Sequence, residues 1–220
     1  MSMPGKLATE ADTQQSMLTA GQPLDRARAA MVLLHGRGGS AEGMLSLVAE
    51  LAHLRMAYLA PEAEGNSWYP YSFLAPLDRN EPELSAALAS VSAALGRVQE
   101  AGIAPERTVL LGFSQGACLA LEYAARHARR YGGVVGFSGG LIGPEGLPRD
   151  YEGSLGGTPV FLGCSDVDPH IPMARVLESA DVLRYMGARV TMRLYPGMGH
   201  TVNADELDAV RSMFRGLPVR

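Results

Sequence analysis

Short apolar runs, rich in β-branched and aliphatic residues, alternate along the chain with longer amphipathic segments. This alternation is typical of strands joined by helices that cover both faces of a mostly parallel central sheet. Most of the short runs are continuously apolar, as strands buried on both faces should be. The pattern therefore predicts an α/β fold. The predicted strands are residues 31–34, 56–60, 108–112, 134–137, 159–163 and 190–195, and the predicted helices are residues 41–52, 83–101, 115–127, 173–186 and 204–214.

The bulk composition narrows the class of protein. A chain of 220 residues, 47% hydrophobic and 19% charged, can bury the core of one α/β domain and is too apolar for a disordered chain. Its net charge of −4 gives no basic surface for nucleic acid. No apolar run approaches the roughly 20 residues of a membrane span, and no signal-peptide block opens the chain. We expect one domain over residues 1–220, with residues 1–16 as a loose arm, no nucleic acid partner and no stable membrane insertion.

The two cysteines, Cys118 and Cys164, both fall in apolar stretches. This placement favours buried free thiols, which are typical of a reducing compartment. We therefore expect a cytoplasmic protein. Two predicted loops, 62–80 and 139–157, are longer than their connections require. Long loops at strand ends tend to carry function, so we expect function in both.

The pattern G-x-S-x-G occurs twice, as "GFSQG" at 112–116 and "GFSGG" at 136–140. A serine nucleophile on this pattern needs a strand that ends, a strained turn that pushes Oγ outward, and a helix N-terminus facing the developing oxyanion. Ser114 follows "TVLLGF" and precedes a helical pattern, whereas Ser138 precedes "GLIGPEGLP", where glycine and proline replace the helix. The sequence favours Ser114 as nucleophile over a merely capping serine, and predicts that Ser138 marks a strand end turning into a loop.

Gly112 and Gly116 flank Ser114 at positions where the turn is tight. A side chain at either position would collide with its neighbours around such a turn. We therefore predict that only a residue without a side chain fits at either position.

A serine hydroxyl also needs a base that is itself oriented by a carboxylate. On an α/β-hydrolase fold the acid and then the histidine follow the serine along the chain. His200, in "YPGMGHTV", comes after the last predicted strand, and "GCSDVDPHIP" ends the strand before it. There Asp168 precedes a proline that favours an extended backbone, while Asp166 is the alternative acid or a cap of that turn. We favour Asp168, and interpret His170 as a loop or pocket residue.

An oxyanion hole needs two backbone N–H groups. The amide of Gln115, directly after the nucleophile, is one candidate. The second is the amide of Arg37 in "LLHGRGGSAEGM", where Gly36, Gly38 and Gly39 would let the backbone approach a substrate.

The same glycines support a rival interpretation. Residues 36–41 match G-x-G-x-x-A after a strand and before a helix, and Glu62 lies where a ribose-binding acid would be expected. A dinucleotide-binding enzyme would leave the order of Ser114, Asp168 and His200 unexplained. We therefore place it, with a non-catalytic binding protein on a hydrolase fold, behind the hydrolase.

Together, "LLHGRGGSAEGM", "GFSQGACLALEYA", "GCSDVDPHIP" and "YPGMGHTV" resemble the phospholipase/carboxylesterase family, which includes acyl-protein thioesterases and small bacterial carboxylesterases. The resemblance covers residues 30–214. It implies an α/β-hydrolase fold without a large cap domain, a Ser114, Asp168 and His200 triad, and no metal or organic cofactor. The D-x-x-I-P spacing that begins at Asp168 matches the family's acid loop and strengthens Asp168 over Asp166.

The resemblance also implies an activity. It predicts a serine esterase that cleaves a small-molecule carboxylic ester through an acyl-enzyme, with acyl-protein thioesterase or lysophospholipase activity as the alternative. A homodimer that buries part of an apolar rim is a further hypothesis.

One departure concerns Arg37, where family thioesterases often carry a bulky aliphatic residue. Its guanidinium could attract an acidic or hydrogen-bonding substrate group or pair with a surface carboxylate such as Glu42, and we favour the pairing. The aromatic segment "GNSWYPYSFLAP" would lie beside the triad. We expect substrate contact from Trp68 or Tyr69.

Overall fold

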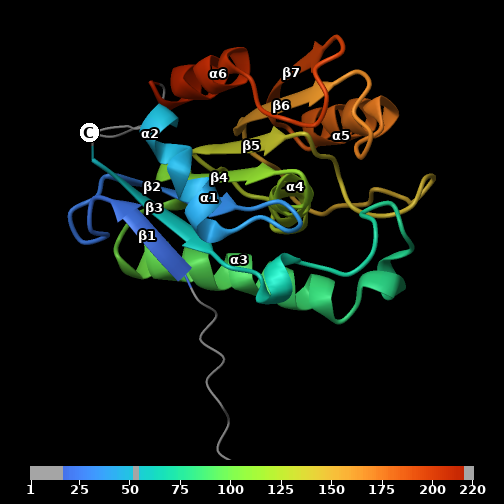
Figure 1. Ribbon diagram of the computed structural model, residues 1–220. Helices are drawn as coiled ribbons and strands as arrows, with labels where there is room; N and C mark the ends of the chain where they lie inside the picture. The colour runs from blue at the N-terminus through green and yellow to red at the C-terminus, as the bar shows by residue number, and fades with distance from the viewer. Residues whose placement is uncertain (1–16, 52–54, 216–220) are drawn as a thin grey trace, which may run out of the picture.

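The computed structural model of the protein describes residues 17–51 and 55–215, and its strands form one seven-stranded sheet (Figure 1). The strand order is β1-β3-β2-β4-β5-β6-β7, with β1 antiparallel to β3 and every other neighbouring pair parallel. The predicted mostly parallel sheet is thereby confirmed. The strands are β1 Met17–Gly21, β2 Ala29–Leu34, β3 Met56–Pro61, β4 Thr108–Phe113, β5 Gly133–Phe137, β6 Pro159–Ser165 and β7 Arg189–Tyr195.

All six predicted strands are present, and β1 is the one that the sequence did not reveal. It pairs with β3 alone at the edge of the sheet, and none of its residues is fully buried. An edge strand of this kind needs no continuous apolar run, so its sequence lacks the signal that marks β2 and β3, which are buried throughout. The loose arm predicted for residues 1–16 lies outside the described residues.

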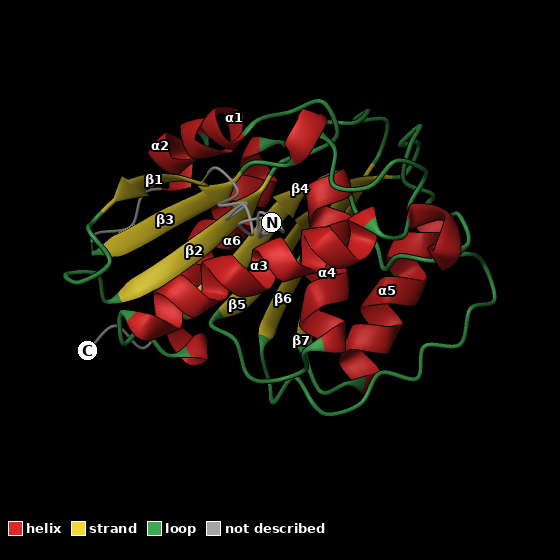
Figure 2. Ribbon diagram, turned by 90° about the horizontal axis from the view of Figure 1, so that it is seen from below, coloured by secondary structure: helices red, strands yellow, loops and turns green. Residues whose placement is uncertain are grey.

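The helices cover both faces of the sheet (Figure 2). Buried residues of α3, α4 and α5 share one core cluster, and those of α1, α2 and α6 share a second one across the sheet. None of the helices within the described residues combines the length and apolar character that crossing a membrane requires. The helices are α1 Ala41–Ser46, α2 Val48–Leu51, α3 Glu83–Glu100, α4 Gln115–Arg126, α5 Met173–Tyr185 and α6 Ala204–Phe214, with short 3₁₀ turns at Glu64–Asn66, Leu77–Asn80 and Pro105–Arg107.

One predicted helix, residues 41–52, is divided in two. The Leu47 amide donates to the carbonyl of Met44, three residues back, at 3.2 Å. The α-helical ladder therefore tightens and stops at Leu47, and α2 begins at Val48 as a separate turn. Its predicted end at residue 52 falls outside the described residues.

The centre of the molecule is the connection between β4 and α4. Every residue of α4 from Gln115 to Ala125 is buried, since the helix packs between the sheet and its neighbouring helices. A Cβ placed on Gly116 would overlap the carbonyl oxygens of Leu34 and His35, and one on Gly112 would overlap the Gly116 carbonyl. Neither position has room for a side chain, as predicted, and the two glycines allow the helix N-terminus to lie against the end of β2.

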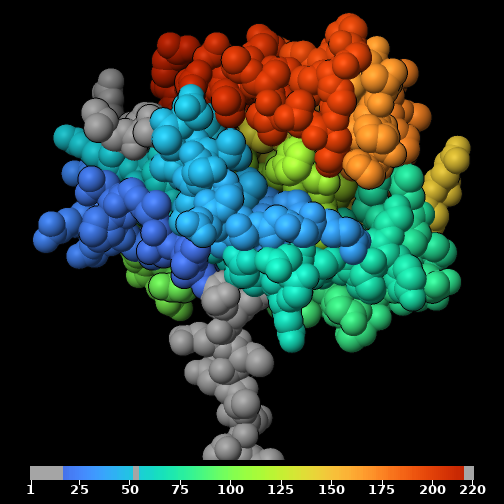
Figure 3. Space-filling view, in the orientation of Figure 1, coloured from blue at the N-terminus to red at the C-terminus, as the bar shows by residue number. Residues whose placement is uncertain are grey.

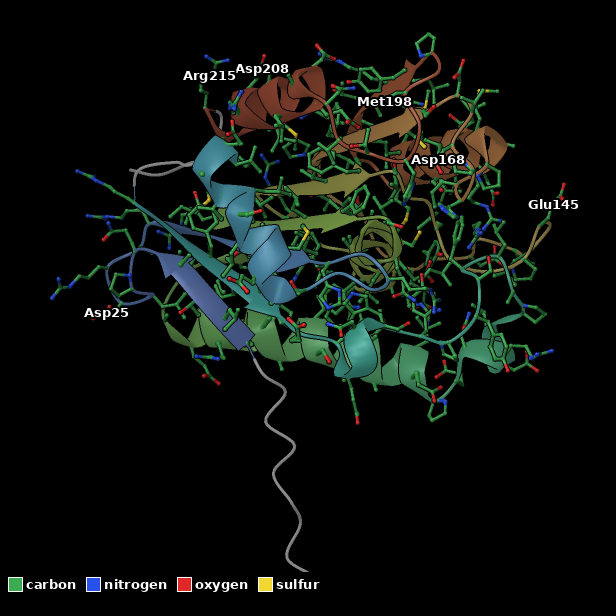
Figure 4. The ribbon with its side chains drawn as sticks, viewed as in Figure 1. Asp25, Glu145, Asp168, Met198, Asp208 and Arg215 are labelled. Carbon is green, nitrogen blue, oxygen red and sulfur yellow. The ribbon has the colours of Figure 1, made fainter. Side chains whose placement is uncertain are left out.

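The loops that leave the carboxyl ends of the strands gather at one end of the sheet. The space-filling view shows yellow-green atoms near residue 115 surrounded by the blue, orange and red surfaces of three other loop regions (Figure 3). Asp168 and Met198, from the loops after β6 and β7, lie at this end (Figure 4). A site built from several loops at the carboxyl ends of parallel strands is typical of open α/β sheets.

The clearance at Gly116 gives a stability prediction. Gly116→Ala should lower the free energy of unfolding by at least about 3 kcal/mol or prevent folding, because the new methyl meets fixed backbone carbonyls on a neighbouring strand. Chemical denaturation measures the effect. Gly96→Ala is the matched control in α3, where a Cβ meets nothing within 4 Å, and it should raise stability by about 0.5–1 kcal/mol. Equal effects of the two substitutions would contradict the packing argument.

Candidate active site

Ser114 occupies the sharp turn between β4 and α4. Its backbone has φ 54° and ψ −119°, a conformation that a residue with a side chain rarely adopts. Two hydrogen bonds hold it: the Ser114 amide donates to the Phe137 carbonyl at 2.9 Å, and the Cys118 amide donates to the Ser114 carbonyl at 3.0 Å. The surrounding structure thus fixes a strained backbone that presents the hydroxyl above the end of the sheet.

Ser114, His200 and Asp168 form a continuous hydrogen-bonded chain. The distance from Ser114 Oγ to His200 Nε2 is 2.8 Å, and that from His200 Nδ1 to Asp168 Oδ2 is 2.7 Å. An ionised carboxylate can only accept, so Nδ1 carries the proton and Nε2 is left as the acceptor for the serine hydroxyl. This tautomer is the one a general base acting on Ser114 requires.

The Asp168 carboxylate is fixed and remains charged. Its Oδ1 accepts from the amides of His170 at 2.8 Å and Ile171 at 3.0 Å, and its side chain is completely shielded from solvent. Burial by itself would raise the pKa of Asp168, but the hydrogen bonds from His200 and these two amides outweigh it and lower the pKa. The carboxylate is therefore ionised at neutral pH and stabilises positive charge on the imidazole.

Asp166 has a different position from Asp168, although both lie on the same loop. It is exposed, and its Oδ1 accepts from the amide of Gly197 at 2.8 Å. This bond ties the loop after β6 to the loop that carries His200. Gly197 and Gly199 have positive φ angles of 65° and 60°, which let that loop turn back over the sheet.

The histidine loop is anchored on its far side by the start of α6. The Asn203 side chain accepts from the Glu206 amide at 2.9 Å, and the Glu206 carboxylate accepts from the Asn203 amide at 2.8 Å. This reciprocal capping box fixes the helix start three residues beyond His200. The ring of His200 also lies 5.0 Å from that of Phe113 and 4.8 Å from that of His170, centroid to centroid.

Ser138 lies at the end of β5 without a helix after it, as its sequence predicts. Its φ of 51° resembles that of Ser114, but it is completely buried, and its hydroxyl lies beside the Cys164 thiol. Ser138 is also not among the residues that line a cavity that lies beside Ser114. The structure thus separates two serines that share the same pentapeptide pattern.

Arg37 and Gln115, the residues whose amides we predict as oxyanion donors, both line this cavity of about 370 Å³ beside Ser114. Neither amide donates to an acceptor within the described part of the chain. His35 holds the Arg37 loop in place: its Nδ1 contacts the Gly36 carbonyl at 2.8 Å, and its Nε2 accepts from the Ala63 amide at 3.0 Å. The sequence analysis did not identify His35, whose only signal is its position directly before the glycine-rich turn.

The Arg37 side chain makes neither of the contacts that we expected. Its guanidinium donates to the Ser67 hydroxyl and to the carbonyls of Tyr69, Pro70 and Tyr71, at 2.8–2.9 Å. It therefore does not pair with a surface carboxylate such as Glu42, and its two terminal nitrogens are engaged by the loop. The reason is geometric, because the planar guanidinium matches the carbonyls of a loop that curves around it.

Gln115 closes the same loop from the other side. Its Oε1 accepts from the Trp68 amide at 2.9 Å and its Nε2 donates to the Tyr69 carbonyl at 2.8 Å. The residue that offers its backbone N–H to the cavity therefore also holds the aromatic segment with its side chain. The sequence suggested only the first of these two contributions.

The aromatic residues divide into structural ones and cavity-lining ones. Trp68 does not line the cavity: it is buried, donates its indole N–H to the His35 carbonyl at 2.8 Å, and packs against the His35 ring. Tyr69, Phe73 and His170 do line it. Of the three predicted substrate contacts, the structure places Tyr69 and His170 at the cavity and Trp68 behind it.

The two long loops also differ. Residues 62–80 supply a wall of the cavity, whereas none of the residues 139–157 borders it. Buried side chains hold that second loop: Glu122 accepts from the Ile142 amide at 3.0 Å, and Arg175 donates to the Leu141 and Gly143 carbonyls. The second loop therefore packs against α4 and α5 and contributes nothing to this cavity, so a function for 139–157 stays a prediction.

The dinucleotide interpretation of residues 36–41 meets a specific obstacle. The Glu62 carboxylate accepts from the amide of Ala41 at the start of α1, at 2.5 Å, and from the Asn66 side chain at 2.8 Å. A pyrophosphate would need that helix N-terminus. Glu62 therefore occupies the phosphate position instead of reaching a ribose. Among the described residues, no cluster of three or more His, Cys, Asp or Glu side chains is placed to hold a metal ion.

Comparisons with known proteins agree with this geometry. A family model described as Phospholipase/Carboxylesterase matches residues 18–216. Acyl-protein thioesterase 1 of Gibberella zeae is 36% identical over 121 residues, 53% of this chain and 50% of that protein. Acyl-protein thioesterase 1 of Saccharomyces cerevisiae is 32% identical over 121 residues, 52% of this chain and 51% of that protein. In both, the chain spans about half the relative's length.

A solved structure resembles the whole chain. The crystal structure of a phospholipase/carboxylesterase from Dyadobacter fermentans is 46% identical, with a TM-score of 0.89, and the match covers 92% of this chain and 97% of that one. The resemblance in fold therefore extends over most of the chain.

The contacts of Arg37 yield a prediction about the cavity wall. Arg37→Met should increase amide hydrogen exchange in residues 67–71 about tenfold or more and lower the free energy of unfolding by about 2 kcal/mol, because four hydrogen bonds to the loop are lost. Arg79→Met is the matched control, since Arg79 lies over the Tyr71 ring without closing the loop. Exchange that is unchanged in Arg37→Met would show that the loop holds its conformation without the guanidinium.

Proposed function

The chain belongs to the phospholipase/carboxylesterase family, and on that premise we propose that it is a serine hydrolase that cleaves carboxylic esters through an acyl-enzyme intermediate. The observation that supports this most directly is the chain of two short hydrogen bonds, 2.8 Å and 2.7 Å, from Ser114 through His200 to Asp168. One cavity is lined by the strained Ser114, by His200 in the required tautomer, and by Arg37 and Gln115. Acyl transfer is the reaction that uses all of them.

In the first half of the proposed reaction, His200 Nε2 takes the Ser114 proton while Oγ attacks the ester carbonyl carbon. The carbonyl π electrons move onto oxygen, and the amides of Arg37 and Gln115 stabilise the resulting oxyanion. Asp168 holds the imidazolium by its Nδ1 proton. His200 then donates its Nε2 proton to the leaving alcohol oxygen as the C–O bond breaks, which leaves an acylated Ser114.

In the second half, water replaces the alcohol. His200 Nε2 takes a proton from the water, whose oxygen attacks the acyl carbon, and the same amides stabilise the second oxyanion. Collapse breaks the bond to Ser114 Oγ, which recovers its proton from His200, and the carboxylic acid leaves. Every proton that His200 takes is returned within the same half-reaction, so the site regenerates itself.

Thioester hydrolysis is the second candidate, because two relatives with identities above 30% are acyl-protein thioesterases. The same groups would serve, with a thiolate as the leaving group. A profile across acyl chain length on oxygen esters and thioesters separates the two. Activity confined to long acyl thioesters would favour the thioesterase, and a preference for short oxygen esters would favour the carboxylesterase. We also infer a reducing cytoplasm as the compartment, supported by the two buried free thiols.

The two serines of the repeated pattern give a direct test. Ser114→Ala should abolish hydrolysis of p-nitrophenyl esters, with kcat falling by about 10⁴-fold or more, because the nucleophile is lost. Ser138→Ala is the matched control and should keep most of the activity, since its hydroxyl is buried away from the cavity. Reversed effects would show that the proposed nucleophile is wrong.

The two acids of the loop after β6 can be distinguished in the same assay. Asp168→Asn should lower kcat by about 10³- to 10⁴-fold, because an amide can donate to Nδ1 and favour the wrong tautomer of His200. Asp166→Asn should lower kcat less than about tenfold, since an amide oxygen can still accept from the Gly197 amide. Similar losses in both variants would contradict the assignment of Asp168 as the acid.

A further inference from the structure

Part of the lining of the cavity beside Ser114 combines apolar side chains with a polar group. Phe73, Phe113 and Ile171 supply the apolar lining, and Tyr69 and Cys118 line the cavity as well. The Tyr69 side chain is 1% exposed, yet its hydroxyl has no oxygen or nitrogen partner among the described residues. Its neighbour is the Cys118 thiol. A buried tyrosine hydroxyl normally finds a hydrogen-bond partner, and leaving it without one costs about 1–3 kcal/mol.

The existing bonds of Cys118 indicate what the Tyr69 hydroxyl can offer. The Cys118 sulfur already accepts from the Gly140 amide at 3.5 Å. The hydrogen bond between the two side chains lowers the pKa of Cys118 and raises that of Tyr69, so the Tyr69 O–H faces the Cys118 sulfur, a weak acceptor that a ligand oxygen can replace. Burial raises the pKa of Tyr69 well above its usual value and that of Cys118 to about 12, so both groups stay protonated at neutral pH.

The charges around the Tyr69 hydroxyl indicate that the matching ligand atom is neutral. The nearest cations are already bonded: Arg37 to the 67–71 carbonyls, and Arg175 to Glu178 and to two loop carbonyls. Glu122 lies close enough to add negative potential at both Tyr69 and Cys118. A carboxylate placed here would be desolvated without a counter-charge, whereas a neutral oxygen would only need the one donor.

The position of Tyr69 relative to His200 indicates which part of the substrate reaches it. The leaving group departs on the side of His200, because Nε2 must protonate it, and the cavity residues His170 and Phe113 lie beside that ring. Tyr69 is instead held by Gln115, whose amide faces the oxyanion, and Cys118 follows one turn later on α4. The acyl group, which stays on Ser114, is the part that can extend toward Tyr69 and Cys118.

We propose that Tyr69 and Cys118 form a polar subsite for the acyl group, so that the substrates of this enzyme are esters of short acids that carry a neutral hydrogen-bond acceptor, such as an ether, hydroxyl or keto oxygen, along the acyl chain. The proposal rests on the proposed function, because it assigns specificity to the same catalytic site. Tyr69 donates to the acceptor, which replaces the weakly accepting Cys118 sulfur.

The test compares p-nitrophenyl esters in which one methylene is replaced by an ether oxygen. The pairs are methoxyacetate and butyrate, 3-methoxypropanoate and pentanoate, and 4-methoxybutanoate and hexanoate. For at least one pair, the ratio of kcat/KM for the ether to that for the alkyl ester should be about fivefold to tenfold higher in the wild type than in Tyr69→Phe. Comparing ratios between proteins cancels the intrinsic reactivity of each ester.

Tyr71→Phe is the matched control, because it removes a tyrosine hydroxyl from the same loop at an exposed position outside the cavity lining. Its ratios should equal those of the wild type. Thermal unfolding checks that each variant is folded. Cys118→Ala should keep the wild-type ratio or raise it, because it removes only a weak acceptor that competes for the Tyr69 O–H. Equal ratios in the wild type and folded Tyr69→Phe for every pair would overturn the proposal.

A binding measurement keeps this test independent of turnover. The same acyl pairs, as methyl esters, are titrated by calorimetry into Ser114→Ala protein, and the ether should bind about fivefold to tenfold more tightly than its alkyl partner. In the Ser114→Ala protein that also carries Tyr69→Phe, the ether and its alkyl partner should bind equally well. Loss of p-nitrophenyl ester turnover would count against the proposed function, whereas a missing difference in binding would count against the polar subsite alone.

Discussion

The close approach of α4 to the end of β2 is the constraint on which the rest of the site depends. Because Gly116 has no side chain, the first turn of α4 lies against the carbonyls of Leu34 and His35. That contact brings the Gln115 amide, at the helix N-terminus, to the same cavity as the Arg37 amide, which follows β2. Ser114, two residues before Gly116, has the strained φ of 54°. The absence of a side chain at Gly116 thus allows the nucleophile and the oxyanion donors to lie close together.

Backbone hydrogen bonds to side chains then fix the loops around that centre. Asp168 accepts from two amides of its own loop, Asp166 accepts from the loop that carries His200, and Asn203 and Glu206 cap the helix beyond it. On the opposite side, Gln115 and Arg37 hold the aromatic wall by its carbonyls. Such bonds hold irregular segments at low entropic cost once formed, and they give loops the positional precision that acyl transfer needs. The cavity is therefore preorganised although most of its lining residues lie outside the strands.

Much of this arrangement was accessible from sequence because it depends on local patterns. Continuous apolar runs predicted the inner strands, and glycine or proline after Ser138 showed that no helix could follow it. The order of Ser114, Asp168 and His200 suggested that they meet, and the structure brings them within hydrogen-bond distance. Edge strand β1 escaped prediction because it buries little, and the break at Leu47 depends on a single backbone hydrogen bond. Arg37 was misjudged because its four acceptors belong to a segment about 30 residues away in the chain.

The sequence by itself determined the α/β class, the strand–turn–helix around Ser114 and the residue types available at each strand end, because periodicity and turn chemistry act over a few residues. Only the tertiary structure decided which of two serines is accessible, which of two aspartates reaches His200, and that Glu62 occupies the helix N-terminus a nucleotide would need. It also decided that Trp68 packs behind the cavity while the Tyr69 hydroxyl is left without an oxygen or nitrogen partner beside it. The reason is that burial and hydrogen-bond partners are set by residues far apart in the chain, and no local pattern records which of them will meet.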